Sequence, residues 1–163
     1  MREEKGRPFV ARLYAGVGFR LSVGCVSVAT VNRREEPVGV KDFLEGDASG
    51  VIVVAKLPLD IQTHLKAKTT RVFLSGGTRD THGHHAWTAE IFAYLQEVLN
   101  RGEVRADRDH HVVVAHFNGK WWYAALKTTR DGKEVYLQSF RRMRPADLPR
   151  FHRRGELVRK TLD

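Results

Sequence analysis

The chain has 163 residues, 42% hydrophobic and 29% charged, so it can bury one core and is not globally disordered. No apolar stretch reaches the roughly 20 uncharged residues of a membrane span, which predicts a soluble protein with no membrane partner. The formal charge of +9 favours a polyanion as partner: nucleic acid, an anionic membrane surface or an acidic protein. A single cysteine, Cys25, excludes an internal disulfide framework and predicts a reducing, cytoplasmic setting.

The first 48 residues differ from the rest of the chain. Their apolar part, between Phe9 and Val31, is interrupted by Arg12, Arg20 and several glycines, unlike the continuous apolar core of a secretory signal. We therefore expect an N-terminal extension of unknown role over residues 1–48. A folded domain with a basic C-terminal tail is expected over residues 49–163.

The elements of this domain can be placed in chain order. The apolar run at residues 51–57 predicts a buried strand that Pro58 ends, and a short helix follows from Asp60 to about residue 66. Residues 70–74 predict a second strand. Thr88 is a favourable N-cap for a longer helix, whose apolar residues recur at steps of three and four until Gly102.

The second half of the domain predicts an antiparallel meander. Strands are expected at residues 111–117, 121–129 and 134–140, and Asn118-Gly119 and Asp131-Gly132 have the composition of tight hairpin turns. Arginines are frequent after this meander, around a possible short helix near residues 147–152. A helix before an antiparallel sheet, with basic residues on and after the sheet, is a plausible platform for a phosphate backbone.

Over residues 50–145 the chain resembles the phage-associated branch of the nuclease superfamily that includes barnase, EndoU, colicin and RelE domains. The most specific similarity lies in residues 122–142, where a lysine ends one strand and Ser-Phe-Arg closes the next. Generic similarities lie in residues 54–59, 72–75 and 85–104. The resemblance implies an α+β fold with one or two helices packed on a curved antiparallel sheet of about four or five strands.

The resemblance also implies an activity, a metal-independent endoribonuclease acting by attack of the 2′-hydroxyl. Such a reaction needs a base, an acid and cations that hold the charge on the phosphoryl oxygens, and it needs no cofactor. The expected catalytic residues are His85, Lys127, Ser139, Arg141 and Arg142. By the same resemblance the protein would be a toxin of a phage, mobile element or toxin–antitoxin system, and an acidic antitoxin or immunity protein would neutralise it.

Physical reasons accompany these assignments. His85 precedes the helix that Thr88 caps, where backbone N–H groups favour an anion. Period-two counting places Lys127 on one strand face with Trp121 and Tyr123, which suits phosphate pairing and base stacking. The same counting places Ser139 on the face of Val135 and Leu137. The guanidinium groups of two consecutive arginines would hold the phosphoryl oxygens. The residues expected to bind RNA are Tyr123, Trp121, Arg130 and Arg144.

Other interpretations stay open. His82, His84 and His85 suggest a metal site, but no carboxylate stands at a recognised spacing, so we expect none. Cys25 has no nearby base that would make it a nucleophile. A basic module that binds nucleic acid without cleaving it is the main alternative, and a membrane-surface effector is a third, which Pro145 and Pro149 disfavour.

Overall fold

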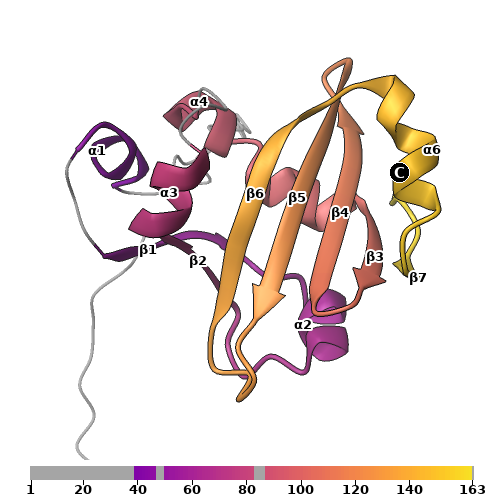
Figure 1. Ribbon diagram of the computed structural model, residues 1–163, viewed down its shortest axis with the longest axis horizontal. Helices are drawn as coiled ribbons and strands as arrows, with labels where there is room; N and C mark the ends of the chain where they lie inside the picture. Colours follow the sequence, from indigo (N-terminus) through magenta and orange to yellow (C-terminus); the bar gives the residue numbers. More distant parts are fainter. Residues whose placement is uncertain (1–38, 47–49, 83–86, 163) are drawn as a thin grey trace, which may run out of the picture. The chain divides into compact units, whose positions relative to one another are not determined.

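The computed structural model describes residues 39–46, 50–82 and 87–162. Seven strands form one mixed sheet in the order β1-β2-β6-β5-β4-β3-β7 (Figure 1). The strands are β1 (Val51–Lys56), β2 (Arg71–Ser75), β3 (Glu103–Asp107), β4 (His110–Phe117), β5 (Lys120–Thr128), β6 (Val135–Met143) and β7 (Glu156–Arg159). The helices are α1 (Val40–Glu45), α2 (Leu59–Leu65), α3 (Gly76–His82), α4 (Ala89–Phe92), α5 (Leu95–Arg101) and α6 (Leu148–His152).

The α+β class is confirmed, but the strand number and the all-antiparallel arrangement are wrong. The sheet has seven strands, and β2 pairs with β6 in parallel, Val72 facing Val135. The two unforeseen strands, β3 and β7, are short and rich in charged residues, so they lack the apolar run that marks a buried strand. The helix expected between Thr88 and Gly102 is divided at Ala93 and Tyr94 into α4 and α5.

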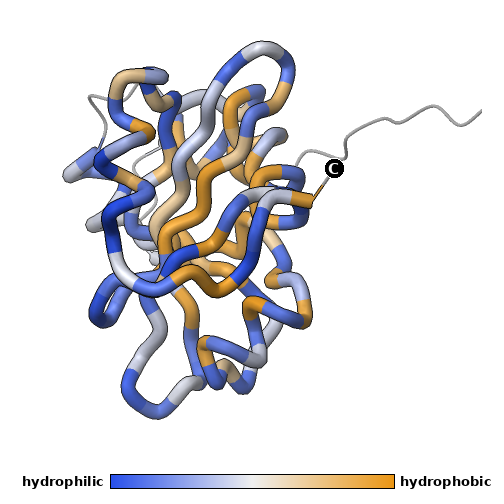
Figure 2. Tube along the Cα trace, turned by 90° about the vertical axis from the view of Figure 1, so that its right-hand side faces the viewer, coloured by the Kyte–Doolittle hydropathy of each residue, from blue (hydrophilic) through white to orange (hydrophobic). Residues whose placement is uncertain are grey.

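The two faces of the central strands have different environments. One face, which we call the covered face, buries Trp122, Ala124 and Leu126 in the main core together with α2, α4 and α5. The other, which we call the open face, carries Tyr123 and Ala125, and among the described residues it packs against α6 in a smaller cluster. The most hydrophobic parts of the chain lie along the strands, and hydrophilic segments lie in the connections (Figure 2). Because α6 has only five residues, none of the helices in the described ranges covers the remaining part of the open face (Figure 1).

Helix α1 belongs to the folded domain. Val40 and Phe43 are 1% and 3% exposed and lie in the main core, and the Arg79 guanidinium of α3 donates to the carbonyl oxygen of Phe43. The predicted boundary at residue 48 is therefore too late, because the apolar positions of this six-residue helix are too few to show a period. None of the helices in the described ranges is long and apolar enough to cross a membrane.

The hairpin between β4 and β5 forms where it was predicted. Asn118 and Gly119 have φ angles of 51° and 68°, the two positive values that a type I′ turn requires. Phe117 pairs with Lys120 across the turn, and this register continues to His110 and Lys127. The turn therefore sets which residues of β5 face the open side of the sheet.

A β-bulge in β6 changes which side chains of the strand's second half lie on the open face. Leu126 pairs with Leu137 whereas Ala125 pairs with Ser139, so Gln138 is an extra residue on β6. Leu137 points into the main core, but Ser139 lies beside Ala125 on the open face. The prediction that Ser139 shares a face with Leu137 is wrong, because period-two counting fails across a bulge.

Candidate functional site: an arginine groove beside the sheet

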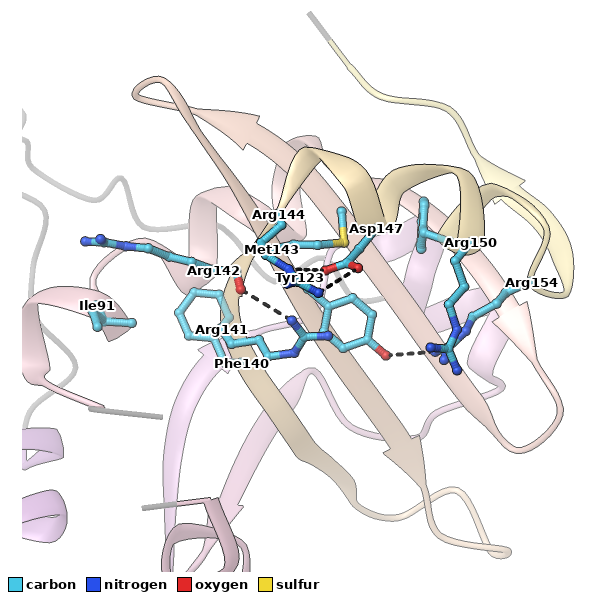
Figure 3. A pocket seen from close by; sticks show the side chains of 11 residues that line it. Ile91, Tyr123, Phe140, Arg141, Arg142, Met143, Arg144, Asp147, Arg150 and Arg154 are labelled. Atoms are coloured by element: carbon cyan, nitrogen blue, oxygen red, sulfur yellow. Dashed lines mark hydrogen bonds and ion pairs between the residues drawn. The ribbon is translucent and has the colours of Figure 1, made fainter. Parts of the chain in front are cut away.

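A groove of about 780 Å³ lies at the end of β6, between this strand, α4 and α6. We call it the arginine groove, because five arginines line it. Figure 3 shows these side chains around Tyr123 of β5. The lining residues are Ile91, Tyr123, Phe140, Arg141, Arg142, Met143, Arg144, Asp147, Arg150, Phe151 and Arg154. The lining contains five guanidinium groups and one carboxylate, that of Asp147, so it is strongly cationic.

Three of the five arginines make no ion pair with a carboxylate in the described part of the chain: Arg141, Arg142 and Arg150. Asp147 pairs with Arg144, with 3.2 Å between Oδ2 and Nε, and this contact holds the pKa of Asp147 below its ordinary value. Arg154 is only 3.9 Å from an oxygen of Asp107. Cations crowded together without counterions repel one another, so this groove favours an anionic ligand.

Tyr123 supports two of the guanidinium groups. The Arg141 guanidinium lies over the Tyr123 ring, 5.0 Å from its centroid, because the two residues face each other on β5 and β6. At the other end of the ring, Arg154 Nη1 donates to the phenol oxygen over 3.4 Å. Figure 3 shows this arrangement. Guanidinium groups held in place by a rigid ring lose little entropy when they bind a phosphate.

Arg141 and Arg142 do not form a single fork. Consecutive residues of a strand point to opposite faces, and the Arg142 guanidinium lies 5.6 Å from the ring centroid of Trp122, a residue of the covered face. In Figure 3 the Arg142 side chain extends toward Ile91 of α4, away from Tyr123. The two arginines reach the groove from different sides of β6, so they would hold different parts of a ligand.

Lys127 lies on the open face as predicted, but outside the groove. It is four residues from Tyr123 along β5, which corresponds to roughly 13 Å. Its ammonium group is 2.8 Å from an oxygen of Asp109, and the other oxygen of Asp109 is 2.7 Å from His110 Nδ1. The hydrogen bond from Lys127 lowers the pKa of Asp109. Lys127 and Arg141 are therefore held at different places on the open face, one at Asp109 and the other over Tyr123.

Ser139 lies between these two positions. It is two residues before Arg141 on β6 and is partly buried on the open face. Because of the bulge, Tyr123, Ser139 and Lys127 share one face of the sheet, although they do not meet at one point. His85, the expected acid or base, lies outside the described residues. Trp87, two residues later, is described: its Nε1 donates to the carbonyl oxygen of Phe140, a residue of the groove lining.

The other residues expected to bind RNA are distributed differently. Arg144 lines the groove but is paired with Asp147. Trp121 packs partly buried against the cluster under α6, next to the groove. Arg130 is exposed in the turn between β5 and β6, at the other end of these strands. Arg150 and Arg154 were not selected from the sequence, because nothing in a basic tail shows which arginines fold back over the sheet.

A pair of histidines forms a separate polar contact between α2 and β4. His64 Nδ1 and His111 Nε2 are 2.8 Å apart, and burial lowers the pKa of His111 to about 4, with the neighbouring His64 and His110 acting in the same direction. In the described ranges, no group of three or more histidine, cysteine, aspartate or glutamate side chains is arranged to hold a metal ion. His84 and His85 lie outside those ranges.

Comparisons of the chain with protein-family models, with curated proteins and with solved structures found no match. The assignment to a nuclease superfamily therefore stays a prediction from the sequence resemblance.

Proposed function

We propose that the protein binds RNA and that the arginine groove is its phosphate-binding site. The observation that carries this proposal is a concave site lined by five arginines, three of which have no carboxylate partner in the described residues, with Tyr123 supporting two of the five guanidinium groups. Arginine matches the geometry of phosphate oxygens, and an aromatic ring beside it offers a surface for a base. A flat membrane surface would not need a concave site. The choice of RNA over DNA rests on the sequence resemblance.

Fluorescence anisotropy with a labelled oligouridine of about 12 nucleotides tests this proposal. Arg141→Gln should weaken binding by about 10- to 100-fold, because a charge-assisted hydrogen bond to phosphate contributes about 1.5–3 kcal/mol. Arg101→Gln is the matched control, because it removes the same charge from α5, where Arg101 is paired with Glu97. Equal affinities for the wild type and both variants would contradict the proposal.

Endoribonuclease activity is the second candidate function, with an acidic antitoxin or immunity protein as the partner that would cover the groove. It is favoured by the placement of Tyr123, Ser139 and Lys127 on one face of the sheet. The separation of Lys127 from the groove, roughly four strand residues, requires that Lys127 acts on a different part of the RNA from Arg141.

Cleavage is tested by incubating the wild type and Lys127→Ala with total RNA in EDTA. Fragments with 2′,3′-cyclic phosphate ends that disappear in the variant would support the metal-independent reaction. Cutting that EDTA abolishes would instead favour the histidines and a metal. RNA binding without fragments would leave the protein as a binding module.

A further inference from the structure

The open face of the sheet extends beyond the arginine groove. From Arg141, it continues through Ser139 to Tyr136, which pairs with Lys127 of β5 on one side and Phe73 of β2 on the other. The centroids of the Phe73 and Tyr136 rings are 5.9 Å apart. Two aromatic rings therefore lie side by side on the same face as the groove, at the opposite end of β6.

This aromatic pair is not part of either buried cluster in the described residues. Both side chains are partly exposed, and the neighbouring Val51 and Val53 of β1 are 49% and 39% exposed. Helix α6, which packs on the open face, contacts the cluster around Ala125 and Met143, next to the groove. The aromatic pair is thus an apolar surface that faces solvent.

Charges around the pair indicate how a polyanion would lie there. Arg71 precedes Phe73 on the same face of β2, and Lys127, whose ammonium group also contacts Asp109, is beside Tyr136, so each ring has a basic side chain as neighbour. Burial and, to a lesser degree, the nearby Glu134 carboxylate raise the pKa of Tyr136, and this carboxylate would repel a phosphate placed directly on the ring. A nucleobase on the ring, with its backbone near the cations, satisfies both conditions.

We infer that the open face binds unpaired RNA bases, with Tyr136 and Phe73 as a stacking site for a strand whose phosphates enter the arginine groove. This inference rests on the proposed function and adds a substrate class to it, single-stranded RNA. A ring on a sheet face can stack only on a base that is not enclosed in a duplex. The protein should therefore prefer an unstructured strand to a hairpin stem of the same length.

The test compares two oligouridines, of about 2 and about 12 nucleotides, and a hairpin, in anisotropy titrations. Tyr136→Leu should weaken binding of the longer strand by about 5- to 150-fold, since one stacked base contributes about 1–3 kcal/mol. The dinucleotide is too short to reach from the groove to Tyr136, roughly 15 Å along β6, so it should bind Tyr136→Leu as it binds the wild type. Tyr136→Phe keeps the ring and should retain the wild-type affinity.

The outcomes separate this inference from the proposed function. If Arg141→Gln weakens binding of the longer strand and Tyr136→Leu does not, the groove binds RNA and the stacking site is wrong. Equal affinity for the hairpin and the strand, or a changed oligomeric state of Tyr136→Leu with unchanged RNA binding, would also overturn it. If the wild type binds no RNA, the proposed function fails first.

A measurement on the wild-type protein tests the same inference even if the Tyr136 variant does not fold. Ultraviolet crosslinking of the longer strand, with 5-bromouridine in place of uridine, should label Tyr136 or Phe73 when the modified residue is located by tandem mass spectrometry. Residue-level labels confined to the lining of the arginine groove would overturn the inference.

Discussion

At the scale of single residues, Tyr123 decides where the positive charge of the groove is held. Its ring lies under one guanidinium group and its hydroxyl accepts from another. Neither arginine has another aromatic ring that could replace this support in the described residues. The tyrosine thus converts two flexible side chains into fixed donors, which is the property a phosphate site needs.

Two substitutions of Tyr123 should therefore have different effects on RNA binding. Tyr123→Leu removes the ring, and we expect a loss of affinity of about 2- to 30-fold, because a cation–π contact contributes about 0.5–2 kcal/mol. Tyr123→Phe keeps the ring and should change affinity much less. Anisotropy titrations measure both, and equal losses would show that the hydroxyl rather than the ring is important.

His111 should make stability depend on pH. In the unfolded chain a histidine has a pKa of about 6.5, whereas in the fold the pKa of His111 is about 4. Between these values the unfolded state binds more protons, so stability is complete above pH 6.5 and decreases as the pH falls toward 4. From pH 7 to 5 the loss should be on the order of 1 kcal/mol, allowing for screening of a ring that is only partly buried.

Thermal melts at pH 7 and pH 5 measure this loss. In His111→Gln the difference between the two pH values should be smaller than in the wild type, because the titrating group is gone. His116→Gln, an exposed histidine of the same strand, is the control and should leave the difference unchanged. An identical pH dependence in His111→Gln would contradict the assignment.

Some site residues could be selected from the sequence and others could not. Four selected residues line the groove: Tyr123, Arg141, Arg142 and Arg144. The strand period and the hairpin turns fix where the first three point, because these residues lie on β5 and β6. Ser139 was assigned to the wrong face, since a bulge leaves no reliable mark in one sequence. Arg150 and Arg154 reach the groove through α6 and the turn after it, and their contacts are long-range.

At the scale of elements, β7 keeps the C-terminal segment against the sheet. It pairs with β3, and Arg159 donates to the carbonyl oxygens of Leu99 and Gly102 and to a carboxylate oxygen of Asp60. Leu99 and Gly102 lie at the end of α5, whose last carbonyls have no partner within the helix. Arg159 is therefore a structural residue, although the sequence alone groups it with the other basic residues of the tail.

Gly155, between α6 and β7, should tolerate no side chain. Its φ angle is 49°, and a Cβ atom there would overlap the carbonyl oxygen of Ala106 in β3. Gly155→Ala should lower the free energy of unfolding by about 1–3 kcal/mol and reduce RNA affinity, because the neighbouring Arg154 would move. Gly77→Ala, in α3, is the control: its Cβ would meet no atom within 4 Å.

Denaturant unfolding and anisotropy measure the two effects of Gly155→Ala. We expect Gly77→Ala to match or slightly exceed wild-type stability, since alanine is the better helix former. Wild-type stability in Gly155→Ala would show that β7 does not depend on this close approach.

At the scale of the whole molecule, the basic residues behind the net charge of +9 have different roles. Some cations are paired, such as Lys127 with Asp109, and Arg159 serves the fold, whereas three arginines of the groove have no carboxylate partner among the described residues. The charge that the groove itself offers to RNA is therefore smaller than the formal charge of the whole chain. Composition alone could predict a polyanionic partner but not the position or the number of the contacts.

This difference can be measured from the salt dependence of binding. Three phosphate contacts to a single strand give a slope of about −2 in a plot of the logarithm of affinity against the logarithm of salt concentration. A binding mode that used the whole formal charge would give a slope about three times steeper. In Arg141→Gln the slope should become shallower by about one contact.

The parallel pairing of β2 with β6 can form only late in synthesis, because the two strands are far apart in the chain. The antiparallel pair of β1 and β2 leaves the ribosome early, but β6, the other neighbour of β2, is made only after three further strands. Until then, the free edge of β2, a strand that contains valine, phenylalanine and leucine, presents unpaired backbone groups to any neighbouring chain. A nascent or truncated polypeptide that stops before Val135 should therefore aggregate, whereas the completed one occupies that side itself.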